Sequence, residues 1–161
     1  MAAVRVRVEP ATWEHARPLA DAMRTADIAE VLALKGIGPE RALVDSIVLS
    51  RESWTAWFDG EVACMFGIRD HPLSTVALRI GIPWLLTGVV IERYPVAFVR
   101  GSRAVLAHFL ESYDLLVQEV DGRYCRALRW LERAGFAVYP ARPLGVEGRP
   151  FHQVALHKEV S

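Results

Sequence analysis

Proton-accepting side chains gather in the second half of the chain, beside expected strands and helix starts. Such a side chain can act as a general base when it lies within hydrogen-bond distance of the reacting group. The candidates are Glu92, Glu119, Asp121 and His152. Glu119 lies on an expected strand, whereas Glu92 follows another. Asp121 is explained better as a helix cap, and a lone histidine such as His152 is more often structural.

Two tyrosine hydroxyls could supply the acid that a departing group needs. Tyr124 lies in an expected helix and Tyr139 on an expected strand. A tyrosine at such a position is more often a core aromatic whose hydroxyl is hydrogen-bonded to a neighbour. Both roles stay open for each tyrosine.

A short basic segment, Arg100-Gly101-Ser102-Arg103-Ala104, has the composition of a phosphate-binding turn. The free N–H groups and the dipole at a helix N-terminus favour anions, and guanidinium groups add charge-assisted hydrogen bonds. We therefore expect a long helix to start near Arg100, with phosphate at its N-terminus. The alternative is an exposed pair of arginines that binds no ligand.

Metal and disulfide chemistry have little support in the sequence. Cys64 and Cys125 are the two cysteines, and neither belongs to a CxxC or Cys/His cluster. We interpret both as buried thiols and expect no metal site.

Alternating and helical apolar patterns place these residues on regular elements. Asp59-Gly60 has the composition of a tight hairpin turn, because a type I′ turn needs positive φ at both central residues. Residues 83–87 read as a strand buried on both faces, and Gly135 ends the last helix. The expected strands cover 4–8, 54–58, 62–68, 83–87, 115–120, 136–139 and 151–157, and the expected helices include 16–23, 39–49, 102–113 and 124–131.

This order of elements predicts an α/β fold in which a central mixed β-sheet carries helices on both faces. Neither a linker nor an internal repeat interrupts the pattern, so we expect one domain over residues 1–161.

The segment VDGRYCRALRWLERAGF at 120–136 resembles the last conserved stretch of the GNAT superfamily of acyl-CoA N-acyltransferases. Gly135 and Phe136 match its end, and Ala127 matches the alanine inside its helix. The element order is similar over nearly the whole chain. The resemblance implies a GNAT-like fold that binds acetyl-CoA and transfers its acetyl group to an amine of unknown identity.

The same resemblance assigns the site. Pantetheine would pair with the backbone of Leu85, Leu86 and Thr87, where the strands at 83–87 and 115–120 diverge, unless the first is a continuous core strand. The pyrophosphate would lie on the turn at Arg100–Ala104. The tyrosine that usually protonates the thiolate falls at Leu131, which has no proton to donate, so catalytic activity stays open.

A narrower resemblance is to the GNAT-like small internal virion proteins of T7-like phages. It rests on the segments WLLTG (84–88), IERYPVAFVRGSR (91–103), RWLERAGF (129–136) and PLGVEGRPFH (143–152). It implies a non-catalytic phage or prophage protein, associated with the virion, that retains the fold. Its partner would be another phage protein or a second copy of the chain.

Composition narrows the remaining classes. The chain of 161 residues is 52% hydrophobic, which allows a sizeable core. Lys+Arg and Asp+Glu are each 19, so the formal charge is zero and we expect no nucleic-acid partner. No apolar run approaches the ~20 residues of a membrane span. We expect neither a signal peptide nor a membrane span, and a cytoplasmic location.

Overall fold

The computed structural model describes residues 3–159, which form one eight-stranded mixed sheet with helices on both faces. The strand order is β1-β2-β3-β4-β5-β8-β6, and β7 pairs with β8. The strands are β1 (Val6–Pro10), β2 (Glu52–Phe58), β3 (Glu61–Asp70), β4 (Ile80–Thr87), β5 (Leu115–Asp121), β6 (Ala137–Val138), β7 (Arg142–Leu144) and β8 (Arg149–His157). The expected mixed α/β sheet is confirmed.

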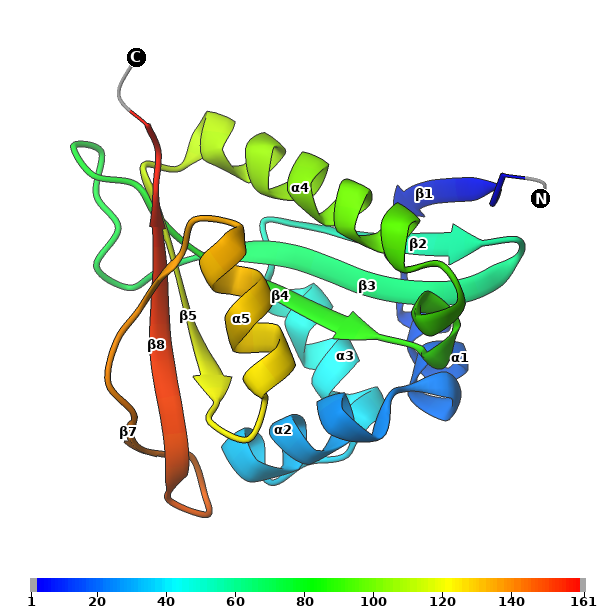
Figure 1. Cartoon of the computed structure of the whole chain (residues 1–161), viewed down its shortest axis with the longest axis horizontal. Coiled ribbons are helices and arrows are strands. Elements are labelled where there is room, and N and C mark those ends of the chain that lie inside the picture. The colour runs from blue at the N-terminus through cyan, green and yellow to red at the C-terminus, as the bar shows by residue number, and fades with distance from the viewer. Residues whose placement is uncertain (1–2, 160–161) are drawn as a thin grey trace.

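The helices form two layers around the sheet (Figure 1). Over one face, α4 and α5 cover a core that includes Phe109, Leu116 and Val154. On the other face, α1 and α3 enclose a second core around Leu19 and Leu43. The helical segments are η1 (Trp13–His15), α1 (Ala16–Ala22), α2 (Thr25–Lys35), α3 (Pro39–Leu49), η2 (Val89–Arg93), α4 (Pro95–Ser112) and α5 (Cys125–Arg133).

The hairpin of β2 and β3 agrees with its turn chemistry. Asp59 has φ 50° and Gly60 has φ 85°, the left-handed conformations that a type I′ turn needs at both positions. Across the hairpin, Trp54 pairs with Phe66 and Ala56 with Cys64. The expected turn is confirmed.

The strands β4 and β5 separate soon after they begin. They are parallel neighbours, but they pair only at Ile80 with Leu115 and at Gly81 with Leu116. Figure 1 shows the two strands starting side by side and then pointing in different directions. As a result Leu85, in the middle of β4, is 38% exposed. The expectation of a strand buried on both faces is wrong, because β5 does not follow β4 along its length.

Two expected helix starts are also wrong. The helix α4 begins at Pro95 rather than near Arg100, because proline's fixed φ and missing N–H suit the first helical position. The helix α5 begins at Cys125 with Tyr124 at its N-cap. Asp121 is therefore not its cap.

Three further differences concern a helix, a strand and a cysteine. The separate helix α2 and the short strand β7 were not expected. Cys64 is buried as expected, but Cys125 is exposed. Among residues 3–159, none of the helices has the length and apolar character needed to cross a membrane.

Candidate functional site

The separation of β4 and β5 leaves main-chain groups of β4 without a strand partner. The C=O of Pro83 accepts a hydrogen bond from Nε2 of Gln118 on β5. The N–H of Thr87 donates to Oδ2 of Asp27 at 2.7 Å, and its C=O accepts from the N–H of Arg24 at 3.0 Å. Residues 83 and 87 thus direct their polar groups away from β3. Since this direction alternates along a strand, the N–H and C=O of Leu85 face the gap.

The gap changes the expected pantetheine contacts. Of the three residues assigned by resemblance, Leu85 has its main-chain groups toward the gap. Leu86 has the opposite orientation and pairs with Met65 of β3. The N–H of Thr87 is already bonded to Asp27 on α2, and its C=O is bonded to the N–H of Arg24, the residue before α2. Leu85 is therefore the one residue of the three whose main-chain groups are free on the open edge of β4. The C=O of Pro83, two residues earlier, already accepts a hydrogen bond from the side chain of Gln118.

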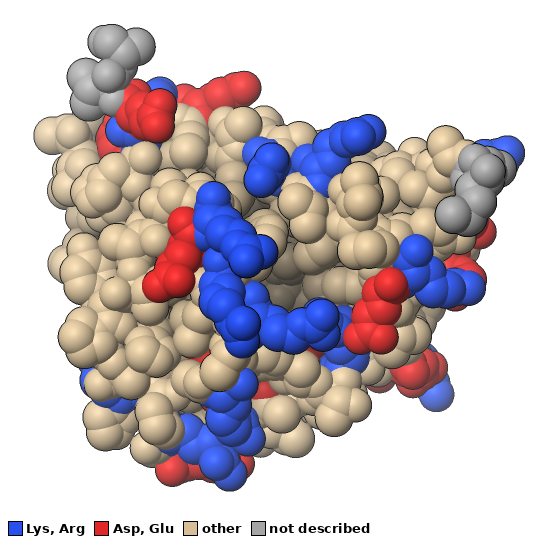
Figure 2. Space-filling view, viewed as in Figure 1, with Lys and Arg blue, Asp and Glu red and all other residues tan. Residues whose placement is uncertain are grey.

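A hollow of about 500 Å³ lies along the first turns of α4, lined by Pro95, Val96, Val99, Arg100 and Arg103. Its lining combines an apolar floor with two guanidinium groups. Figure 2 shows basic side chains around a hollow near the middle of the face that it displays. Such a surface suits a ligand that has both a flat apolar part and a negatively charged part.

The phosphate-binding turn expected at Arg100–Ala104 is not a turn. Gly101, Ser102 and Ala104 lie inside α4, and Ser102 Oγ donates to the C=O of Phe98 at 2.8 Å. Main-chain N–H groups inside a helix are bonded within it, so these residues cannot hold an anion with their backbone. The side chains of Arg100 and Arg103 remain exposed beside the hollow.

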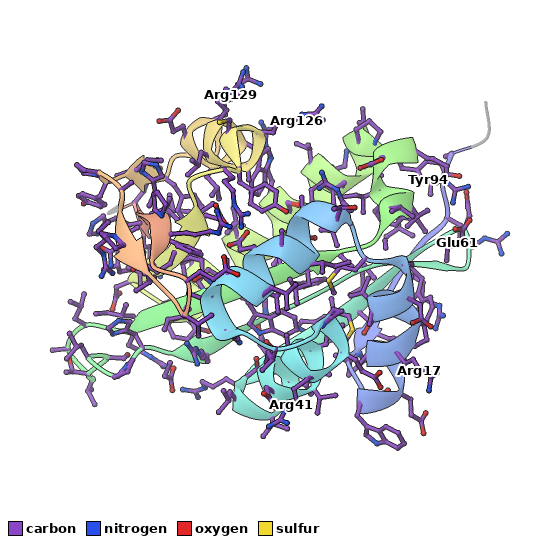
Figure 3. The ribbon with its side chains drawn as sticks, turned by 90° about the horizontal axis from the view of Figure 1, so that it is seen from below. Arg17, Arg41, Glu61, Tyr94, Arg126 and Arg129 are labelled. Carbon is purple, nitrogen blue, oxygen red and sulfur yellow. The ribbon has the colours of Figure 1, made fainter. Side chains whose placement is uncertain are left out.

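Two more exposed arginines, Arg126 and Arg129, lie on α5. In Figure 3 they occupy the same side of the molecule as α4, and Arg126 extends from α5 toward α4. Among the described residues, neither of them makes an ion pair, and the same is true of Arg100 and Arg103. These four side chains, the arginine rim, are available to a polyanion.

The helix α2 lies across the open end of the gap and is tied to both strands. Asp27 on α2 accepts hydrogen bonds from the N–H and Oγ1 of Thr87, at the end of β4. The C=O of Ala29 accepts a bond of 3.5 Å from Nη2 of Arg123, which follows β5. Glu30 comes next on α2, so it lies between the two strand ends. The arginine rim thus lies on α4 and α5, whereas α2 is bonded to the ends of β4 and β5.

The carboxyl groups at the strand ends are not equivalent. Burial, together with the neighbouring carboxylates of Asp27 and Asp121, raises the pKa of Glu30 to about 7, although the N–H of Asp121 and the charge of Arg123 oppose part of the shift. Burial likewise raises the pKa of Asp27, although its bonds to Thr87 oppose the shift. Near neutral pH, Glu30 is therefore divided between its protonated and charged forms.

Asp121 is the exception in this group. It is fully buried, and burial alone would raise its pKa. Its carboxylate, however, accepts bonds from Nη2 of Arg123 at 2.6 Å and from the N–H of Arg123 at 2.9 Å, and these bonds hold its pKa below the usual value. Asp121 is thus a charged partner of Arg123 and a poor proton acceptor.

The hydroxyl of Tyr124 is buried and has no hydrogen-bond partner among the described residues. Burial raises the pKa of this phenol, and the carboxylates of Asp27 and Glu30 raise it further. The hydroxyl therefore keeps its proton at neutral pH. A buried hydroxyl without a partner is costly in a folded protein, which fits a site where a ligand atom completes the hydrogen bond.

The other sequence candidates lie in less suitable surroundings. Glu119 forms an ion pair with Arg142 of β7, and its second oxygen is buried with no hydrogen-bond partner within residues 3–159. Glu92 is exposed and pairs with Arg24 at 3.2 Å. Nδ1 of His152 donates to the C=O of Tyr139 at 2.8 Å. Leu131 packs against the core under α4 and α5.

Sequence reasoning missed Asp27 and Glu30, because α2 was not recognised as a separate helix. One signal was present in the sequence. The segment TADIAEVLALK carries two acidic residues three apart in an otherwise largely apolar helix, a spacing that places both on one face. Nothing local, however, indicates that this face meets the ends of β4 and β5.

No family model and no curated protein sequence matches the chain. Solved structures of similar fold include a GNAT-family acetyltransferase from Streptococcus pneumoniae, with a TM-score of 0.61 and 14% identity over 96% of this chain and 100% of that chain. An aminoglycoside N(6')acetyltransferase from Legionella pneumophila has a TM-score of 0.69 and 11% identity over 98% and 94%.

A third similar structure is a protein from Salmonella typhimurium solved with its cofactor acetyl-CoA. It has a TM-score of 0.68 and 10% identity, over 98% of this chain and 96% of that chain. At these identities the likeness establishes the fold. The chain therefore has the fold of GNAT acetyltransferases.

Proposed function

We propose that the protein is an acyl-CoA N-acyltransferase that moves the acetyl group of acetyl-CoA to an amine. The observation that carries this proposal is the gap between β4 and β5, which pair over two residues and then separate. A sheet interior normally satisfies its backbone groups with a neighbouring strand. Here the N–H and C=O of Leu85 are left for an extended, amide-containing ligand, and pantetheine is such a ligand.

The hollow along α4 and the arginine rim fit the rest of the donor. The adenine would rest on the apolar hollow beside Val96 and Val99, and the arginine rim would hold the phosphates. This assignment keeps Arg100 and Arg103 as donor-binding residues and adds Arg126 and Arg129. It relies on guanidinium side chains rather than on a glycine turn.

Tyr124 is the proposed acid. As the amine nitrogen attacks the thioester carbonyl carbon, a C–N bond forms and the C–S bond breaks. The departing sulfur then needs a proton, and the hydroxyl of Tyr124 holds one in a buried position. This role would compensate for Leu131, which cannot donate a proton. Of the earlier catalytic assignments, Tyr124 is kept, whereas Glu119 and Glu92 are occupied by Arg142 and Arg24.

The competing function is a non-catalytic phage or prophage protein that uses the fold as a scaffold in the virion or its assembly. No observation in the structure favours it over acyl transfer. A scaffold has no need for a split sheet edge or for a buried hydroxyl without a partner.

Calorimetry of the purified protein with acetyl-CoA tests the proposal. We expect saturable binding and a rise in melting temperature, since a ligand at 100 times its Kd stabilises the folded state by about 2.7 kcal/mol. Leu85→Pro would remove the N–H that faces the gap and should weaken binding, with circular dichroism as the folding control. If millimolar acetyl-CoA produces neither heat nor a thermal shift, the fold serves as a scaffold.

A further inference from the structure

We propose that Gln118 closes the narrow end of the gap between β4 and β5 and thereby restricts the donor to short acyl groups such as acetyl. This inference rests on the proposed function and names the class of acyl-CoA that its site would accept. Gln118 would contact the end of the acyl group, which makes it a specificity-determining residue.

Gln118 replaces the first missing connection between the two strands. The last paired residues are Gly81 of β4 and Leu116 of β5, and the same register would place Pro83 opposite Gln118. In place of a main-chain bond, Nε2 of the Gln118 side chain donates to the C=O of Pro83. The gap therefore begins beyond this side-chain bridge.

The bridge is fixed at both ends of the amide group. Oε1 of Gln118 accepts a hydrogen bond of 2.7 Å from the N–H of Glu119, while Nε2 is bonded to Pro83. Moving the side chain would leave polar groups without partners, which is costly in a partly buried place. Because strand residues alternate between faces, Gln118 shares the face of Leu116 and Val120, which lie in the core under α4 and α5.

The helices decide which end of the donor would point toward Gln118. The strands β4 and β5 diverge as they run toward Thr87 and Asp121, and α4 and α5 follow these ends after short connections (Figure 1). The arginine rim lies in the N-terminal half of α4 and the first two turns of α5. With the phosphates held there, the thioester at the other end of the donor points toward the narrow end of the gap.

The length of the donor fits this bridge when it carries an acetyl group. Leu85 and Pro83 are separated along β4 by about 6–7 Å. With the pantetheine amide nearest the sulfur paired to Leu85, the five bonds from its nitrogen to the acetyl methyl carbon span about 6 Å. The methyl group then ends at the level of Gln118. A hexanoyl group is longer by several methylenes and would collide with the bridge.

The test measures donor binding without an acceptor amine. Calorimetry gives the Kd of CoA, acetyl-CoA and hexanoyl-CoA for wild type, Gln118→Ala and Gln118→Asn. Wild type should bind hexanoyl-CoA at least about tenfold more weakly than acetyl-CoA, because overfilling a fixed space is unfavourable. Alanine removes the bridge, and asparagine is too short to span it. Both variants should therefore bind hexanoyl-CoA within about threefold of acetyl-CoA.

The other glutamine of the chain supplies the matched control. Gln153 lies on β8, one strand away from the gap, and Gln153→Ala should keep the wild-type preference for acetyl-CoA. Circular dichroism and CoA affinity show whether each variant is folded, and Gln118→Asn is the milder change if the alanine variant is not.

Two results would overturn the assignment of Gln118 and leave the proposed function standing. One is wild type that binds hexanoyl-CoA as tightly as acetyl-CoA, and the other is a folded Gln118 variant that keeps the preference for acetyl-CoA. If wild type binds none of the three CoA compounds, the proposed function itself fails, and the assignment of Gln118 fails with it.

Discussion

Asp121 and Glu30 lie in one cluster, yet their pKa values move in opposite directions. Asp121 gains a guanidinium partner that offsets its burial, so its charge is stable inside the fold. Glu30 is partly buried beside two other carboxylates and, among the described residues, makes no ion pair of its own, so the nearby charge of Arg123 offsets only part of the shift. A charge in that position opposes folding, because the N–H of Asp121 and the charge of Arg123 offset only part of its desolvation.

Replacing Glu30 by Gln should stabilise the protein at alkaline pH. The folded-state pKa of about 7 exceeds the ordinary 4.5, so the unfolded chain releases this proton first and stability falls as pH rises through that window. The difference corresponds to about 3 kcal/mol at pH 8 and less than about 0.5 kcal/mol at pH 4.5. Urea unfolding of both proteins at the two pH values measures it.

The exposed Glu40 on α3 is the matched control, since Glu40→Gln should change stability little at either pH. A Glu30→Gln protein that is equally or less stable than wild type at pH 8 would show that the carboxyl is well solvated or well paired. In that case the surroundings described for Glu30 would be wrong.

At the scale of elements, α4 shows how one misplaced helix start changes a functional assignment. With a start near Arg100, Gly101 would belong to an anion-binding turn. With the observed start at Pro95, Gly101 is an interior helical residue, and a Cβ added there would meet nothing within 4 Å. These two positions of the glycine predict opposite effects of the same mutation.

Gly101→Ala should stabilise the protein by about 0.5–1 kcal/mol, because alanine is the better helix former at an open helical position. Gly60→Ala should destabilise it by about 1–2 kcal/mol, since Gly60 has φ 85°. Both effects are read from chemical denaturation midpoints. A loss of stability in Gly101→Ala would argue for the turn rather than the helix.

The same helix is fixed to the sheet by Phe109, which is 2% exposed in the core under α4 and α5. Phe109→Ala should cost about 3–5 kcal/mol, from lost burial and the cavity that remains. Val96→Ala, in the exposed first turn of α4, is the control and should cost less than about 0.5 kcal/mol. Denaturant unfolding measures the loss in free energy of unfolding for both variants. Similar losses in the two would contradict this packing.

At the scale of the molecule, the site exists only because separate layers meet. The arginine rim combines α4 and α5 on one face of the sheet, and α2 closes the gap at the ends of β4 and β5. The formal charge of the chain is zero, so the expected attraction for a polyanion depends on the local placement of the arginine rim rather than on net charge. Figure 2 shows basic side chains around the hollow on the face that it displays.

Arg126→Ala should weaken acetyl-CoA binding by about three- to tenfold at low ionic strength, because an exposed guanidinium group gains a phosphate partner. The effect should shrink near 1 M salt, where the Debye length is about 3 Å. Arg17→Ala, on α1 and far from α5 in Figure 3, is the control. Calorimetry at two salt concentrations decides it, and an equal effect of both substitutions would remove the arginine rim from the site.

The sequence by itself determined the features that depend on neighbours along the chain. Asp59-Gly60 specified its turn because two adjacent residues must adopt positive φ. Pro39 and Leu49 bounded α3 as expected, and the helical stripe through Phe109 identified the buried face of α4. The mixed α/β sheet followed from the order of these elements.

Only the tertiary structure decided the gap, the helix that closes it and the residues inside it. The pattern of residues 83–87 is apolar whether or not a strand lies alongside, so it could not reveal that β5 diverges and leaves Leu85 half exposed. Asp27 and Glu30 are ordinary acidic residues in the sequence. Their shifted pKa values arise from burial against Thr87, Asp121 and Tyr124, which are 60 to almost 100 positions away along the chain. Such contacts are long-range, and no local pattern encodes them.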